Sequence, residues 1–160
     1  RLLARETDLH FEQVSAIFSG VAELKKFFDA ARARREMGKG TLLFVDEIHR
    51  FNRAQQDSFL PVMEDGTIVL IGATTQNPFF SINGPLLSRS QIFSFEALGR
   101  EHIKEVIRQA LADEERGLGQ LRISITDDAL AFLAEICDGD ARRALTALDI
   151  GEKSVQASGG

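Results

Sequence analysis

The sequence contains no tryptophan, no tyrosine and a single cysteine, Cys137, among its 160 residues. One cysteine cannot form an internal disulfide, which excludes a disulfide-stabilised secreted domain and fits a reducing cytoplasm. Long apolar runs are also missing: runs such as residues 42–45 and 68–71 have only four residues, whereas a membrane span needs about 18. We therefore expect a cytoplasmic globular protein without a membrane partner.

Three sequence patterns that would indicate particular chemistries are missing. No cysteine or second histidine stands at ligand spacing from His10, His49 or His102, so no zinc site is expected. No G-x-S-x-G motif supports a serine hydrolase. The sequence also has no match to G-x-x-x-x-G-K-[ST], the loop whose backbone amides and lysine cradle phosphates.

The chain has no excess of positive charge, since 19 Lys and Arg residues stand against 24 Asp and Glu, for a net charge of −5. This balance excludes non-specific nucleic-acid binding by overall charge and leaves room for a local basic patch. The best such patch comprises Arg32, Arg34, Arg35 and Lys39. A solvated helix face explains this patch about as well as contact with DNA does.

Apolar spacing in the first hundred residues alternates between strand and helix patterns. Short apolar segments predict strands at residues 11–14, 42–45, 67–71 and 92–95. Helical spacing fills residues 21–37, before Gly38, and residues 53–64, before Gly66. Strands that alternate with helices indicate an α/β fold with a parallel sheet.

The pattern becomes helical after Gly99, which places a boundary between a domain of residues 1–99 and a domain of residues 100–160. Three helices are expected in the second domain. Thr126 is the expected N-cap of the second helix and Asp140 that of the third. Cys137 falls on an apolar helix face, so we interpret it as a core residue.

The most informative segment is the apolar strand at residues 42–45, which is followed by Asp46 and Glu47. Ligands of open α/β sheets bind along the carboxyl edge of the strands, where this pair is expected. There Asp46 can hold a hydrated Mg²⁺ beside phosphates, and Glu47 can orient or deprotonate an attacking water. A strand that simply meets a solvated turn is the alternative.

Three other side chains are weaker candidates. Thr75 ends the next strand at the same edge, where a hydroxyl can position a water near a phosphate. Arg89 can reach a phosphate on a neighbouring subunit, although an exposed arginine at a helix end is the simpler interpretation. Arg142 lies in the first turn of a helix, where a basic side chain opposes the helix dipole unless an anion lies nearby.

Taken in order, four segments resemble those of AAA+ ATPases. Residues 42–47 resemble the Walker B strand, and residues 72–75 resemble the sensor 1 strand. Residues 87–89 resemble the arginine-finger segment, and residues 139–142 resemble the sensor 2 helix. More narrowly, residues 44–57, FVDEIHRFNRAQQD, resemble the replication-associated recombination protein A family, which includes the eukaryotic Werner-helicase-interacting ATPase. Residues 71–78 and 139–145 are similar to the same family.

This resemblance implies ATP and Mg²⁺ as cofactors and a role for each candidate. Asp46 would bind the Mg²⁺, Glu47 would activate the water, and the γ-phosphate would be read by Thr75 and Arg142. Arg89 would be the finger that acts on a neighbouring subunit, which requires a homo-oligomer. Related ATPases hold a polar residue that restrains the Walker B glutamate, and Ser15 occupies its place.

The family is associated with stalled replication forks. The resemblance therefore implies DNA as a partner, at forks and at junctions of single and double strands, together with single-stranded-DNA-binding protein. It also implies a location in the bacterial cytosol, near the nucleoid. The implied function is ATP-driven DNA maintenance in recombination and repair. The alternatives are a nucleotide-dead AAA+ interaction module of clamp-loader type and a Holliday-junction branch-migration motor.

In this family the phosphate-binding loop would lie immediately before residue 1, and an oligomerisation domain would follow residue 160. We therefore expect the middle part of a longer protein. Its fold would be an α/β core of the AAA+ P-loop type, without its first strand and Walker A loop, followed by an α-helical lid. On their own, these residues should bind ATP poorly.

Overall fold

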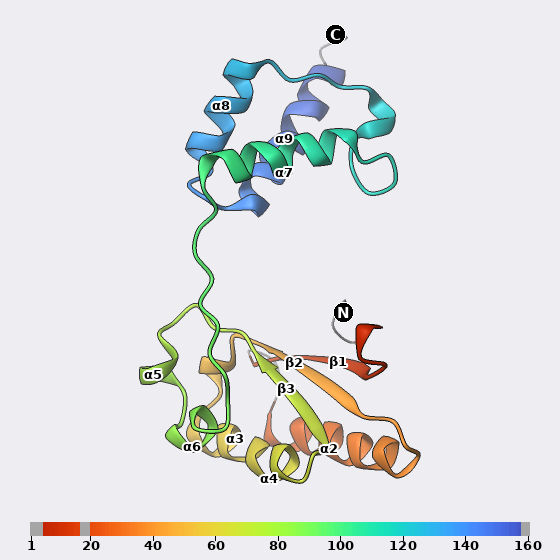
Figure 1. Ribbon diagram of the computed structural model, residues 1–160, viewed down its shortest axis with the longest axis vertical. Helices are drawn as coiled ribbons and strands as arrows, with labels where there is room; N and C mark the ends of the chain where they lie inside the picture. Colours follow the sequence, from red (N-terminus) through yellow and green to blue (C-terminus); the bar gives the residue numbers. More distant parts are fainter. Residues whose placement is uncertain (1–4, 17–19, 158–160) are drawn as a thin grey trace. The chain divides into compact units, whose positions relative to one another are not determined.

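The computed structural model describes residues 5–16 and 20–157 (Figure 1). The chain divides into two compact units, Arg1–Ile92 and Phe93–Gly160. Each unit has its own apolar core. None of the described helices is both long and apolar enough to cross a membrane.

The first unit is built on a sheet of three parallel strands in the order β1-β2-β3. The strands are β1 (His10–Ser15), β2 (Thr41–Asp46) and β3 (Ile68–Gly72). Ser15 pairs with Asp46, and Val45 pairs with Gly72, so the carboxyl ends of all three strands lie at one edge. The predicted α/β fold and the first three predicted strands are confirmed.

One long helix and several short ones complete this unit. They are α2 (Val21–Glu36), the 3₁₀ turn η1 (Ile48–Arg50), α3 (Arg53–Asp57), α4 (Phe59–Glu64), α5 (Pro78–Ser81) and α6 (Gly84–Leu87). Helix α2 follows the prediction closely and ends before Gly38, whose φ of +81° favours glycine. Figure 1 shows α2 and α4 on the same side of the sheet.

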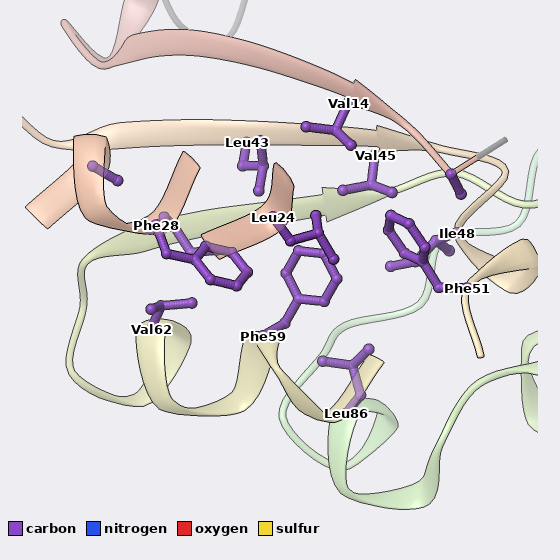
Figure 2. Close-up of a cluster of buried hydrophobic side chains, with 13 residues drawn as sticks. Val14, Leu24, Phe28, Leu43, Val45, Ile48, Phe51, Phe59, Val62 and Leu86 are labelled. Carbon is purple, nitrogen blue, oxygen red and sulfur yellow. The ribbon is translucent and has the colours of Figure 1, made fainter. Parts of the chain in front are cut away.

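The core of the first unit lies between the sheet and these helices. Phe59 of α4 is fully buried at its centre, with its ring 5.4 Å from that of Phe28 and 5.7 Å from that of Phe51. Figure 2 shows these rings beneath Leu43 and Val45 of β2. The core therefore fixes β2, the strand that leads into the predicted carboxylate pair.

The predicted continuous helix at residues 53–64 is instead two helices, α3 and α4, that meet at Ser58. Pro61 has no backbone N–H, so it cannot continue the hydrogen-bond ladder of α3 and is accommodated in the first turn of a new helix. The Ser58 hydroxyl donates to the carbonyl of Gln55 at 2.6 Å. The single-helix prediction was wrong because it was based on the spacing of apolar residues, which does not show that Pro61 lacks a backbone N–H.

The predicted strand at residues 92–95 is wrong, because this segment has no regular secondary structure. Its apolar side chains are exposed, with Phe93 at 71% and Phe95 at 97%. Alternating apolar residues favour a strand, but a strand requires a hydrogen-bonded neighbour. The described sheet pairs nothing with this segment.

The second unit is helical, as predicted. Its elements are α7 (Arg100–Ala112), the 3₁₀ turn η2 (Gly119–Leu121), α8 (Asp127–Ile136) and α9 (Ala141–Ala157). The Thr126 hydroxyl caps α8 by accepting from the amide of Ala129 at 3.3 Å. Asp140 accepts from the first amides of α9, and Cys137 is buried in the core with Ile107. Both predicted caps and the core assignment of Cys137 are confirmed.

Candidate active site at the carboxyl ends of the strands

The edge formed by the ends of β2 and β3 gathers the candidate side chains of the first unit. Leu43 and Val45 of β2 are buried, and they anchor the strand up to its last residue, the exposed Asp46. Glu47 follows directly. Because β3 runs parallel beside β2, its continuation carries Thr75 to the same edge. The structure thus brings together Asp46, Glu47 and Thr75.

A sharp turn after β2 sets the direction of Glu47. Its backbone is left-handed, with φ of +53°, which is uncommon for a residue with a side chain and costly unless the surroundings enforce it. Two hydrogen bonds enforce this backbone conformation. The amide of Ile48 donates to the carbonyl of Ala73 at 3.0 Å, and the amide of Ala73 donates to the carbonyl of Val45 at 2.9 Å. The turn is therefore fastened to β3.

Gly72 permits this fastening. A Cβ at position 72 would lie 2.9 Å from Cδ1 of Ile48, closer than real contacts allow. Ile48 is buried at 5% exposure, so it occupies the space that a side chain on residue 72 would need. The absence of a side chain at Gly72 allows η1, and with it the Glu47 turn, to pack on the end of β3.

Two side chains contact the Glu47 carboxylate on the same oxygen. The Thr75 hydroxyl donates to Oε2 at 3.4 Å. His49 Nε2 lies 3.3 Å from Oε2, and the histidine side chain is only 8% exposed. Thr75 was expected at this edge, but sequence reasoning considered His49 only as a metal ligand.

Asp46 suits a magnesium ion that binds together with phosphates. Carboxylate oxygens are the hard ligands that Mg²⁺ prefers, and one or two carboxylates are enough when phosphates supply further ligands. Within residues 5–16 and 20–157 no group of three or more His, Cys, Asp or Glu side chains could hold a metal ion alone. The donor set fits a metal that arrives with a nucleotide better than a resident structural ion.

Ser15 lies at the end of β1, in register with Asp46 on the neighbouring strand. It therefore shares the edge of the sheet with the candidate site. Among the described residues no hydrogen bond joins Ser15 to Glu47, whose contacts come from Thr75 and His49.

The structure does not bring Arg89 to this edge. Its Nε lies 2.6 Å from Oε1 of Glu64, and its Nη1 donates to the carbonyl of Pro85 at 3.0 Å. Glu64 ends α4, which leads into the amino end of β3, and the five residues of that strand span about 13 Å. Arg89 therefore lies toward the opposite end of the strand from Thr75.

Arg142 belongs to the second unit, where it is exposed in the first turn of α9. Its amide donates to Oδ1 of Asp140 at 2.8 Å. The unfavourable position of a cation at a helix start is thus partly offset by the capping carboxylate.

The predicted basic patch is largely neutralised by ion pairs. Arg34 pairs with Glu12, and the other two pairs are Arg32 with Asp29 at 3.2 Å and Arg35 with Asp65 at 3.6 Å. Within the described part of the chain, Lys39 is the one member without an ion pair. These pairs favour the interpretation of the patch as a helix face.

Comparison with known proteins now defines the class. Residues 1–98 match the model of the AAA family, the "ATPase family associated with various cellular activities". This match covers more than half of the chain, so the chain belongs to the AAA family.

Individual relatives narrow the resemblance. The chain is 46% identical over 149 residues to replication-associated recombination protein A of Escherichia coli K12, covering 93% of this chain and 33% of that protein. It is 44% identical over 154 residues to "ATPase WRNIP1" of Dictyostelium discoideum, covering 96% of this chain and 18% of that protein. The resemblance to this family is confirmed, and the chain spans about a third of the length of its bacterial relatives.

A solved structure supports the fold. The structure of a point mutant of Thermotoga maritima RuvB aligns with a TM-score of 0.75 and 21% identity, over 99% of this chain and 51% of that one. The predicted AAA+ fold class, an α/β core with a helical part, is therefore confirmed.

Proposed function

We propose that this chain is the central part of an ATP-hydrolysing DNA-maintenance protein that acts at stalled replication forks. The observation that carries the proposal is the Glu47 carboxylate, held by Thr75 beside Asp46 at the carboxyl edge of a parallel sheet. Membership of the AAA family and similarity to replication-associated recombination protein A support it.

In this proposal ATP would supply the phosphoryl group and Mg²⁺ the charge that neutralises it. Asp46 would hold the metal through its exposed carboxylate. Glu47 orients the attacking water and accepts its proton, which is the role of a positioned base in phosphoryl transfer. Thr75 and Arg142 read the γ-phosphate as sensors 1 and 2, and Ser15 is a further polar residue at the same edge.

Arg89 acts in trans in this proposal. Its side chain is 45% exposed and lies away from Asp46 and Glu47 of its own chain, so in this proposal it acts on the ATP of a neighbouring subunit. A guanidinium placed there stabilises the charge of the transition state. The protein is accordingly a homo-oligomer, and residues 100–160 form a lid whose Arg142 couples nucleotide state to lid position.

The partners in this proposal are DNA, at forks and at junctions of single and double strands, and single-stranded-DNA-binding protein. The location is the cytoplasm. Similarity to replication-associated recombination protein A over 93% of the chain supports the proposed partners and the proposed location. Three arginines of the basic patch are paired with carboxylates, which favours a solvated helix face for this patch over a DNA contact.

ATP turnover of the intact gene product, measured with and without forked DNA, tests this function. We expect Mg²⁺-dependent hydrolysis that forked DNA stimulates. Asp46→Asn should abolish it, whereas Asp29→Asn, which removes an exposed carboxylate on α2, should not. A protein that binds no ATP would instead be an interaction module, and a preference for four-way junctions over forks would indicate a branch-migration motor.

A further inference from the structure

We propose that His49 and Thr74 form a relay of polar contacts that positions the Glu47 carboxylate for its work on the attacking water. This inference rests on the proposed function, since it assigns positioning residues to the same site. Neither residue contacts the reacting atoms in this account. They act through Glu47.

The relay is continuous in the structure. His49 Nε2 lies 3.3 Å from Oε2 of Glu47, and its Nδ1 lies 2.9 Å from the Thr74 hydroxyl. That hydroxyl in turn accepts from the amide of Gln76 at 3.1 Å. Three side chains and one backbone group therefore connect the end of β2 to the loop after β3.

The contacts of Thr74 favour one tautomer of His49. The Thr74 hydroxyl has one proton, and His49 Nδ1 at 2.9 Å is a nearer acceptor than the Gln76 carbonyl at 3.5 Å. A neutral imidazole that accepts at Nδ1 has its proton on Nε2, the nitrogen that lies 3.3 Å from Oε2 of Glu47.

Burial makes His49 a firm support. Its side chain is 8% exposed, and the neighbouring Ile48 is packed against Gly72 and hydrogen-bonded through its amide to Ala73. Glu47 itself is a flexible side chain that is 26% exposed. A carboxylate that would otherwise rotate freely is thus tied to a rigid ring.

The relay also determines which carboxylate oxygen is available. The Thr75 hydroxyl donates to Oε2, and His49 Nε2 lies at ion-pair distance from the same oxygen. Among the described residues no hydrogen bond or ion pair involves Oε1, which leaves it to accept from the water. A fixed division of this kind matters because an error of about 1 Å in the placement of a catalytic group can reduce turnover about 100-fold.

The same unit contains a matched histidine–carboxylate pair that serves as a control. His10 Nε2 lies 3.2 Å from Oε1 of Glu12, at the start of β1 and away from the carboxyl edge. Its side chain is 40% exposed. Removal of His10 deletes a comparable contact without touching the Glu47 relay.

Steady-state ATP hydrolysis by the intact gene product tests the relay. For His49→Ala we expect kcat to fall about tenfold or more while KM and the affinity for ATP stay within about twofold, because Glu47 loses its support and nucleotide contacts remain. His10→Ala should leave both constants unchanged. Thermal melts of each variant separate an effect on turnover from an effect on folding.

Rescue variants keep the test decisive even if His49→Ala folds poorly. In His49→Gln the amide nitrogen reaches about as far as Nε2 and should restore most of kcat. In His49→Asn the side chain is too short to reach Glu47, so kcat should stay low. Thr74→Ser keeps the hydroxyl and should retain activity, whereas Thr74→Val should lower kcat.

The outcomes distinguish the relay from the proposed function. Wild-type kcat in His49→Ala, or equal kcat in His49→Gln and His49→Asn, would overturn the relay. Failure of the proposed function has a different signature: the wild-type protein would not hydrolyse ATP, or Glu47→Gln would remain fully active.

Discussion

Arg89 forms an ion pair with Glu64 of the same chain, with 2.6 Å between Nε and Oε1. The guanidinium is thereby held toward the amino end of β3, whereas Glu47 and Thr75 lie at the carboxyl end of the sheet. Both side chains of the pair are about half exposed, so the pair itself contributes little stability.

Arg89→Ala should abolish ATP turnover, because under the proposed action in trans each site of a homo-oligomer would lose the cation supplied by its neighbour. Mixing Arg89→Ala with Glu47→Gln subunits should restore part of the activity. In the mixture, an intact Glu47 on one subunit can meet an intact Arg89 on the other. Turnover of the mixture across a range of ratios is the measurement, and activity that never recovers would refute action in trans.

Gly72→Ala should impair both folding and turnover, since its Cβ would lie 2.9 Å from Cδ1 of Ile48. Overpacking of this kind costs about 1–3 kcal/mol. The double variant Gly72→Ala/Ile48→Val lacks the clashing Cδ1 and should recover part of the loss. Denaturant unfolding and ATP turnover measure the two effects, and a fully stable, fully active Gly72→Ala protein would contradict the role given to this glycine.

Phe59→Ala should destabilise the first unit by about 3–5 kcal/mol, the usual cost of removing a buried aromatic ring. Phe59 is fully buried and contacts the rings of Phe28 and Phe51. Phe80→Ala is the matched control, because Phe80 is 91% exposed and its loss should change stability by less than about 0.5 kcal/mol. Equal unfolding midpoints for the two variants would be inconsistent with the described core.

Asp65 should make stability depend on pH at the turn before β3. A side-chain hydrogen bond from Thr67, the backbone amide of Thr67 and the charge of Arg35 hold the pKa of Asp65 below its ordinary value. The folded state therefore favours the ionised form of Asp65. The stabilisation by this carboxylate is fully present above its unfolded pKa of about 3.9, and it is lost as the pH falls through the lower pKa of the folded state.

Asp65→Asn should accordingly lower the melting temperature at pH 7, and the difference from the wild-type protein should shrink as the pH falls below about 4. Melting curves of both proteins across this range provide the measurement. A difference that is the same at pH 7 and at pH 3 would show that the charge of Asp65 has no part in it.

Local patterns predicted the elements whose stability is decided locally. Strand β2 is a continuous apolar run that ends in charge, and α2 has helical spacing that stops before Gly38, so both were found close to their observed bounds. Residues 92–95 have an equally good strand pattern, but their state depends on a neighbouring strand that the described sheet does not provide. Spacing carries no information on that neighbour.

The site shows the same division. Strand ends at one edge of a parallel sheet follow from the pattern, so the meeting of Asp46, Glu47 and Thr75 could be predicted. The contacts of His49 with Glu47 and Thr74 could not, because they depend on the left-handed backbone of Glu47 and on the hydrogen bond between Ile48 and Ala73. A turn of that shape has no simple signature in the sequence.

The Glu47→Gln variant of the intact gene product tests the central claim most directly, by separate measurement of ATP binding and ATP turnover. Glutamine keeps the shape of the side chain but cannot accept a proton from water. We expect ATP affinity to be retained and turnover to fall about 100-fold or more. Glu36→Gln, at the exposed end of α2, should behave as the wild-type protein does. Near-normal turnover in Glu47→Gln would contradict the assignment of this edge of the sheet as the hydrolytic site.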